Sequence, residues 1–510
     1  MIFERLRPAL IAGLCVLFLA GGNAPAFADS PSTGGDLTIA QSLGDRELTL
    51  VLRRVTGTPG PLHVDVITHA GTAPGRLTMS ATPMGITGAS SALPAAGVPT
   101  TQAVLDIGQT PGTYSTGLDV DRPGPWELAL GDGYRVAHIP FLVPVQATSP
   151  PERAVYGGFV AAGILLLVSV LVAARARRGG WVLLPAAGLV AAIAVAVTGA
   201  VLSASLPLPP QPGSQLDPTI DNVTDPYARN GPLITDFSRP PVLLAPGGNP
   251  LTAGKPGELE LNLTDGATGA PVDDLIIHDS ALIHLLVVSP SGRLWHLHPI
   301  RTASGRYQQH LTLPEPGHYA VSAEMVRRGG GVQLVRVPAG LDVSGTGPVS
   351  APVNPVVLAD GATAGSADIG GTSIGVEVAN PAAGRPAAVT VQVGGTADLQ
   401  PWLGMAGHMI VAGPLLSDTD IGTAVGKAPV WAHAHSMGGA AGTGRVAMPP
   451  VNGDSTPDET VAAYGPDVSF TYSFPTAGRY RLWIQVERAY AVITIPVVLD
   501  VPAATEGGRR

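Results

Sequence analysis

Two stretches of the chain share one pattern: AGKPGELELNL spans residues 253–263 and AGRPAAVTVQV spans residues 383–393. In each stretch, turn residues lead into alternating apolar and polar residues, which predicts a β-strand with one buried face. Similar segments follow both stretches in the same order. The spacing therefore predicts a duplicated β-sandwich, with one copy over residues 250–346 and the other over residues 351–502.

Histidines recur in register within this duplication. Each copy has an Asp-Leu pair, a histidine nine residues after that leucine, and then a His-x-His motif close behind a tryptophan. Side chains two positions apart on a strand lie on one face, about 7 Å from each other. The single histidine lies on the preceding predicted strand and can supply a third ligand. The pattern predicts two metal sites, formed by His284, His296 and His298 and by His408, His433 and His435, with Met437 as a soft ligand in the second.

Other donors are close enough in sequence to join these sites. His278 and His310 are candidates for the first site, and Met405 and Met409 are candidates for the second. Neutral imidazole together with thioether sulfur suits copper best, and zinc or nickel on imidazoles alone is the alternative. Met325 is expected in the core.

The rest of the chain predicts more β-structure. Residues 29–148 alternate in short runs such as 48–52 and 63–67, which predicts an extracytoplasmic β-sandwich that is a divergent third copy without a His-x-His motif. Residues 205–249 predict a Pro-rich linker, and residues 503–510 a disordered tail. The expected fold class is mainly β, with three immunoglobulin-like sandwiches and one helical hairpin.

Two apolar stretches, about 155–174 and 181–204, are long enough to cross a bilayer. They predict a transmembrane hairpin over residues 153–204, with a short arginine-containing connector on the cytoplasmic side. Neither span contains Asp, Glu, His or Lys, which favours an anchor over a transporter. A buried soluble hairpin is the alternative.

Residues 1–28 have the features of a signal peptide that ends on the small-residue sequence Ala26-Phe27-Ala28. An uncleaved anchor helix is the alternative. Cleavage would remove Cys15, the only cysteine, so no thiolate ligand is expected in the mature chain. The expected location is the cell membrane, as a multi-pass protein with large extracytoplasmic domains and the lipid bilayer as a partner.

Several functions are not supported by the sequence. Lys and Arg are scattered and the net charge is -9, so nucleic-acid binding is not expected. No catalytic motif is present, and we do not expect an enzyme. The acidic pairs at 273–274 and 458–459 are expected in solvated turns, and His63 and His69 at the surface. The alternative to a metal site is a structural or interaction module of the cell envelope, in which the histidines bond loop carbonyls.

The duplicated region resembles a family of bacterial extracytoplasmic domains. The resemblance rests on a strand ending in Gly-His at 398–408, a His-x-His-Pro strand at 295–299 and a Pro-x-x-Gly-x-Tyr segment at 475–480. Residues 29–148 are similar to YtkA-like and FixH-like immunoglobulin-type sandwiches, which are similar in turn to CopC-like copper-resistance domains. Two departures are Ser436 in place of the family's proline and Ile283 in place of the glycine before the histidine.

This resemblance implies an immunoglobulin-like fold and a link to copper or heavy-metal handling. The expected function is that of an extracytoplasmic copper buffer, or of a chaperone that passes copper to a membrane protein partner.

Overall fold

The computed structural model describes residues 36–53, 55, 57–84, 99–143, 149–175, 179–205, 240–328, 330–346, 354–436 and 459–504. These residues all belong to one compact unit, residues 32–510. The predicted signal peptide (1–28), Met437 and residues 505–510 lie outside the described residues, as does most of the predicted linker.

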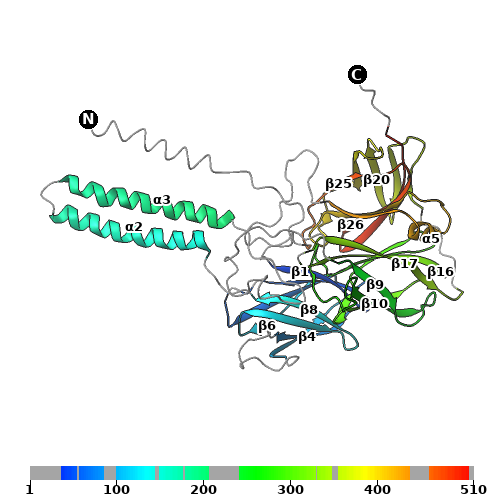
Figure 1. The fold of residues 1–510 in the computed structure, drawn as a ribbon, viewed down its shortest axis with the longest axis horizontal. Helices are drawn as coiled ribbons and strands as arrows, with labels where there is room; N and C mark the ends of the chain where they lie inside the picture. The colour runs from blue at the N-terminus through cyan, green and yellow to red at the C-terminus, as the bar shows by residue number, and fades with distance from the viewer. Residues whose placement is uncertain are drawn as a thin grey trace, which may run out of the picture. The chain divides into compact units, whose positions relative to one another are not determined.

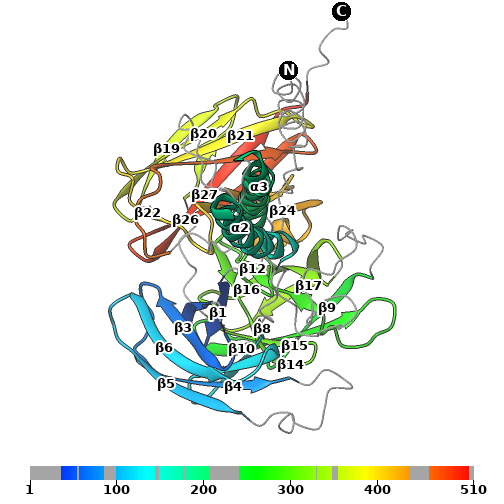
Figure 2. The same ribbon diagram turned by 90° about the vertical axis from the view of Figure 1, so that its left-hand side faces the viewer.

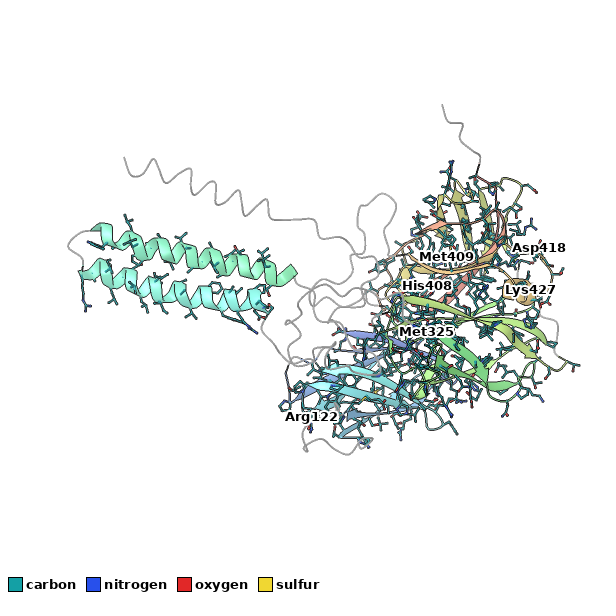
Figure 3. All side chains as sticks on the ribbon, in the orientation of Figure 1. Arg122, Met325, His408, Met409, Asp418 and Lys427 are labelled. Carbon is teal, nitrogen blue, oxygen red and sulfur yellow. The ribbon has the colours of Figure 1, made fainter. Side chains whose placement is uncertain are left out.

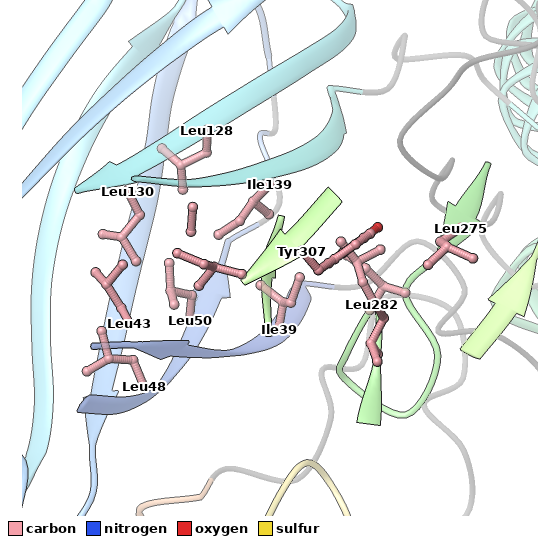
Figure 4. Packing of buried hydrophobic residues seen from close by; sticks show 14 of the residues in the cluster. Ile39, Leu43, Leu48, Leu50, Leu128, Leu130, Ile139, Leu275, Leu282 and Tyr307 are labelled. Atoms are coloured by element: carbon pink, nitrogen blue, oxygen red, sulfur yellow. The ribbon is translucent and has the colours of Figure 1, made fainter. Parts of the chain in front are cut away.

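The N-terminal sandwich has two four-stranded sheets (Figure 2). Its strands alternate buried and exposed residues, so each sheet presents one apolar face to the other. Leu48 and Leu50 of one sheet and Leu128 and Leu130 of the other are fully buried (Figure 4). The first sheet has the order β1 (Leu37–Leu43), β2 (Arg46–Leu52), β3 (Gly60–Thr68), β6 (Gly112–Val120), and the second has the order β5 (Thr101–Ile107), β4 (Gly75–Pro83), β7 (Gly124–Gly131), β8 (Val136–Val143).

The first repeat sandwich is built in the same way. One sheet has the order β14 (Ile300–Ala303), β15 (Arg306–Thr312), β10 (Pro256–Asp265), β9 (Val242–Gly247). The other has the order β11 (Leu275–Ile276), β16 (Gly317–Arg327), β12 (His284–Val288), β13 (Leu294–Leu297), with β17 (Val332–Val343) on β16. The prediction that the linker extends to residue 249 was wrong, because residues 242–247 form the edge strand β9, which pairs with β10.

The second repeat sandwich, the other copy of the duplication, also has two sheets. One sheet has the order β19 (Ala364–Ile369), β20 (Thr372–Ala379), β21 (Pro386–Val393), β25 (Asp467–Ser473). The other has the order β18 (Val356–Leu358), β27 (Ala491–Val501), β26 (Gly478–Arg488), β23 (Gly407–Gly413), β24 (Val430–Ser436), with β22 (Leu399–Gln400) on β26. The order β19-β20-β21-β25 matches β1-β2-β3-β6, so the N-terminal sandwich and this repeat share a topology.

The two repeats pack through the sheets that carry the histidines. Strand β12 is buried on both faces, because Leu285 lies in the core of its own sandwich while Leu286 lies in a separate apolar cluster. That second cluster also contains Ile410 and Trp483 from the second repeat. The Trp483 indole Nε1 donates to the Gly292 carbonyl at 2.9 Å, which fixes the two repeats face to face.

The N-terminal sandwich also packs against the first repeat. Its buried residues and those of the first repeat form one continuous hydrophobic cluster, in which Ile39 lies with Leu282 and Tyr307 (Figure 4). All three of these side chains are at most 2% exposed. The strand β1 therefore contributes to the packing of two sandwiches.

Two apolar helices, α2 (Pro150–Arg175) and α3 (Leu183–Ser205), lie side by side (Figure 1). A short 3-10 turn, η1 (Gly179–Val182), leads into α3. A side chain at Gly158 would lie 2.8 Å from the Ala192 carbonyl oxygen, so the glycine permits close helix packing. Both helices are long and apolar enough to span a membrane. The first begins earlier than predicted because Ser149 and Glu152 form a reciprocal cap.

Candidate metal centre

Five of the six predicted histidines lie on strands that face each other across the two repeats, and His298 directly follows the end of β13. His296 pairs in register with Leu286, and His433 pairs with Ile410. Because strand side chains alternate, the residues on these faces point away from the sandwich cores and toward the other repeat. We call the six residues the histidine cluster: His284, His296, His298, His408, His433 and His435.

The ring nitrogens within each repeat are in contact. His284 Nδ1 lies 3.0 Å from His296 Nε2. His433 Nε2 lies 3.2 Å from both His408 Nδ1 and His435 Nε2. Ligand nitrogens bound to one ion at about 2.0–2.1 Å stand about 3 Å apart, so these separations fit shared coordination.

The two repeats contribute to one cluster instead of two separate ones. The ring centroid of His296 is 5.0 Å from that of His433 and 5.5 Å from that of His408. Donor atoms lie within 4.8 Å of one another in two sets, one made by His284, His296 and His298 and the other by His296, His408 and His433. The first set is the predicted one. The second differs from the prediction, because His296 from the other repeat takes the place of His435.

Backbone carbonyls set the orientation of two rings. His284 Nε2 donates to the His278 carbonyl at 3.2 Å, and His408 Nε2 donates to the Trp402 carbonyl at 3.1 Å. A carbonyl oxygen only accepts, so the proton lies on Nε2 and the lone pair of Nδ1 points into the cluster. The carbonyl contacts expected for structural histidines therefore exist, and they leave the inward nitrogens available as ligands.

Side chains of each repeat orient a histidine of the other. His296 Nδ1 donates to Gln485 Oε1 at 2.9 Å, and His433 Nδ1 lies 3.5 Å from Glu324 Oε1. Gln485 pairs with His408, and Glu324 pairs with His284, so the two acceptors occupy equivalent positions. The interface thus has an approximate two-fold relation.

These contacts bring lone pairs face to face. With its proton on Nδ1, His296 directs the lone pair of Nε2 at the lone pair of His284 Nδ1, across the 3.0 Å gap. Two like lone pairs at this distance repel each other unless a cation lies between them. A cation between the two nitrogens would remove this repulsion, so the cluster could hold a metal ion.

Burial disfavours protonation of these rings, so a proton is not favoured as that cation. Removal from water lowers the pKa of His284, His296 and His408 well below the ordinary value, and their histidine neighbours lower it further. Burial likewise lowers the pKa of His435 to about 4. Neutral imidazoles are the form that binds metal ions.

The N-terminal sandwich closes the cluster on one side. The His298 ring bonds Glu47 through Nδ1, and its backbone N–H donates to Ser42 Oγ at 2.9 Å. The Ser42 N–H donates back to the His298 carbonyl at 2.8 Å. His298 Nε2 is buried and has no hydrogen-bond partner among the described residues, so it is available to an ion.

The polar side chains beside the cluster, Glu324, Gln485 and Asp279, were not predicted from the sequence. Glu324 and Gln485 each stand five residues after the tyrosine of a Gly-x-Tyr segment, as polar residues within apolar runs. Burial would raise the pKa of Glu324, but the charge of His433 and its neighbours lowers it. Burial would likewise raise the pKa of Asp279, but its histidine neighbours lower it, His278 most strongly.

Several sequence expectations about nearby donors were wrong. Met409 is fully buried in the core of the second repeat, because it alternates with His408 along β23 (Figure 3). His310 bonds Glu258 at 2.6 Å on the opposite sheet. His278 does lie beside the cluster, and Met325 is core as expected.

Three groups expected in solvent are buried instead. His69 Nδ1 lies 2.6 Å from Glu487 Oε1, which joins the N-terminal sandwich to the second repeat. Glu459 accepts the Leu403 N–H at 2.6 Å, and burial raises its pKa to about 7. Asp274 forms an ion pair with Arg327 at 3.0 Å. Charge pairing across long sequence separations explains the burial of His69 and Asp274, and the hydrogen bond from Leu403 accompanies that of Glu459. His63 is exposed as expected.

Comparisons with known proteins give little on function. A family model described as a domain of unknown function (DUF8832) matches residues 367–503, which is the second repeat. No curated protein matches the chain.

The solved structures that match the chain include two adhesion proteins and a protein described as membrane-anchored. One is a tetra-tandem repeat in the extending region of a large adhesion protein, with 9% identity, a TM-score of 0.14, and coverage of 92% of this chain and 74% of that one. Another is the Escherichia coli adhesin FdeC, with 10% identity, a TM-score of 0.14, and coverage of 94% and 100%. A putative membrane-anchored protein from Corynebacterium diphtheriae has 8% identity, a TM-score of 0.13, and coverage of 91% and 94%. Scores at this level carry no argument about this chain.

Proposed function

We propose that the chain is a membrane-anchored, extracytoplasmic metal-binding protein whose histidine cluster holds copper. The observation that carries the proposal is the pair of lone pairs, on His284 Nδ1 and His296 Nε2, that face each other at 3.0 Å in a buried site. A purely structural pair would place a proton between these nitrogens, and burial opposes that proton.

The donor set favours copper. Sets of three neutral imidazoles bind Cu(I) and Cu(II) well, and copper stands highest among divalent first-row metals for nitrogen ligands. Zinc is the second candidate on the same ligands. The resemblance to YtkA-like, FixH-like and CopC-like domains agrees with copper and is itself part of the proposal.

The burial of the cluster favours storage or guided transfer. The His433 side chain is 0% exposed and that of His298 is 1% exposed, while His435 is 15% exposed. An ion would enter and leave by the side of His435. Such limited access suits a buffer, or a chaperone that hands copper to a membrane protein partner.

The two apolar helices supply the anchor in this proposal. They would cross the membrane as a hairpin, with the sandwiches on the extracytoplasmic side and the arginine-containing connector in the cytoplasm. The helices only hold the protein in the bilayer, because neither carries an ionisable group along its apolar span.

The test uses the full chain purified in detergent and stripped with a chelator. We expect tight binding of Cu(I) or Cu(II), measured by competition with a chromophoric ligand, and a rise in melting temperature on loading. His296→Ala should abolish this binding, because His296 belongs to both donor sets. His63→Ala, at an exposed position, is the matched control. Unchanged melting with excess copper, zinc or nickel would instead support a metal-free structural module.

A further inference from the structure

A second group of donors lies beside the histidine cluster, at its exposed side. His278, Asp279 and Glu324 offer donor atoms that lie within 4.8 Å of one another, and none of the three belongs to the sets described above. We propose that these residues, here called the mouth site, bind a second metal ion, a divalent cation of the zinc type.

The geometry places two carboxylates and an imidazole around one point. His278 Nε2 lies 3.0 Å from Asp279 Oδ2, and Asp279 Oδ2 lies 3.4 Å from His435 Nδ1. Glu324 approaches from β16 and is 5% exposed. Zinc takes nitrogen and carboxylate oxygen ligands together at about 2 Å, whereas Cu(I) disfavours carboxylate.

A buried nitrogen points into the same space. His433 Nδ1 lies 3.5 Å from Glu324 Oε1 and makes no hydrogen bond within the described part of the chain. Its ring is fully buried, and an unsatisfied buried polar atom of this kind costs about 1–3 kcal/mol. An ion at the mouth site would satisfy it by replacing the Nδ1 proton, which leaves to water, so that His433 would bridge the two ions as an imidazolate.

The second repeat has none of these ligands. At the positions equivalent to His278, Asp279 and Glu324 it has Trp402, Leu403 and Gln485, as the spacing before His284 and His408 and the strand register show. The repeat therefore folds and orients its histidines without a charged group there. The fold of a repeat therefore does not require the two carboxylates of the first one.

The backbone turn that carries Asp279 is common to both repeats. Asp279 has φ 48° and Ser280 has φ 61°, in a two-residue turn closed by hydrogen bonds between His278 and Ala281. In the second repeat Leu403 has φ 53° and Gly404 has φ 76°, in a turn closed by hydrogen bonds between Trp402 and Met405. The backbone conformation therefore belongs to the repeat, and what is particular to the first copy is the carboxylate that the turn holds toward His278 and His435.

The mouth site lies where ions would reach the cluster. The side chains of His435 and Asp279 are 15% and 18% exposed, in contrast to the sealed inner histidines. His435 links the two positions, because its Nε2 faces His433 and its Nδ1 faces Asp279. The full chain should therefore hold two kinds of ion at once.

The experiment replaces Asp279 and Glu324 by the residues that stand at the equivalent positions of the second repeat. Full-length protein in detergent, loaded first with one equivalent of Cu(I), is dialysed against Zn(II), and both metals are counted by elemental analysis. We expect one bound zinc in the wild type and none in the Asp279→Leu/Glu324→Gln variant, and the copper content of both proteins shows whether the inner centre is loaded. Asp279→Asn alone, which keeps the shape of the side chain, should weaken zinc at least tenfold.

A second variant separates this proposal from the first. His284→Ala removes an inner ligand, so it should weaken copper binding and leave the zinc equivalent in place. Equal zinc content in the wild type and the double variant would overturn the mouth site, even if copper binds as expected. Zinc binding that persists when no copper binds would leave the mouth site standing and remove the copper proposal.

Discussion

The imidazole rings of His296 and His433, which occupy equivalent positions in two copies of one repeat, lie 5.0 Å apart across the interface between the copies. Each of these histidines approaches a side chain of the opposite copy, Gln485 for His296 and Glu324 for His433. The centre therefore belongs to the pair of repeats, and either sandwich alone would carry only part of it.

The acceptor Gln485 should matter for metal affinity although it is not a ligand. Gln485→Leu removes the group that holds the His296 proton on Nδ1, so the lone pair of Nε2 is no longer fixed. We expect copper affinity to fall about 10–100-fold, as is usual when an orienting partner of a ligand is lost. Competition titration measures this effect. Gln392→Leu, at an exposed strand position, is the control and should bind as the wild type does.

Packing between the repeats should control the centre from a distance. Trp483 is not a ligand: it is fully buried in the apolar cluster between the copies, and its indole N–H donates to the Gly292 carbonyl. Trp483→Ala should lower the free energy of unfolding by about 3–5 kcal/mol. It should also weaken copper binding with every ligand still present.

Phe474→Leu is the matched control for that packing effect. Phe474 lies in the core of the second repeat alone, so its loss should lower the melting temperature with little change in copper affinity. Equal copper affinity in the Trp483→Ala protein and the wild type would contradict a centre shared by the two repeats. Melting curves and competition titrations on both variants make the comparison.

The ion pair between His69 and Glu487 should make stability depend on pH. Burial alone would lower the pKa of His69, but the hydrogen bond and charge of Glu487 outweigh it and raise the pKa to about 9. Because the folded value is above the ordinary one of about 6.5, this stabilisation is complete below about pH 6.5 and is lost as the pH rises through 9. The free energy of unfolding, measured by melting, should be higher for the wild type than for His69→Asn by on the order of 2 kcal/mol at pH 6. The two values should converge near pH 10.

The matched control for this effect is His63→Asn, which changes an exposed histidine of the same sandwich. Its melting difference from the wild type should be small at every pH. A gap between wild type and His69→Asn that stays constant from pH 6 to pH 10 would contradict the ion pair as the cause.

The proposed membrane hairpin predicts which positions a thiol reagent can reach. Tyr134 is 93% exposed on the N-terminal sandwich, and Arg177 belongs to the connector between the two helices. In intact cells, with Cys15 changed to Ser, an impermeant thiol reagent should label Tyr134→Cys and leave Arg177→Cys unlabelled until the membrane is opened. Labelling of both before lysis would contradict the proposed orientation.

Much of the local structure was predictable from the sequence because it depends on neighbours in the chain. The alternation at 259–263 and 389–393 predicts strands that β10 and β21 confirm. Two spans of uniformly apolar residues predict the helices α2 and α3. The same alternation places both histidines of each His-x-His on one face, and it puts Met409 on the other face from His408.

The sequence by itself determined the fold of each sandwich, the two apolar helices and the presence of three histidines in each copy. Only the tertiary structure decided that the copies meet through their histidine faces, which merges two expected sites and brings His296 into both donor sets. The burial of His69, Asp274 and Glu459 was decided at the same level. The physical reason is the sequence separation over which each interaction acts. Strand alternation depends on adjacent residues and can be read from the sequence. Apolar packing around Trp483 and pairing of buried charges join segments that lie far apart in the chain.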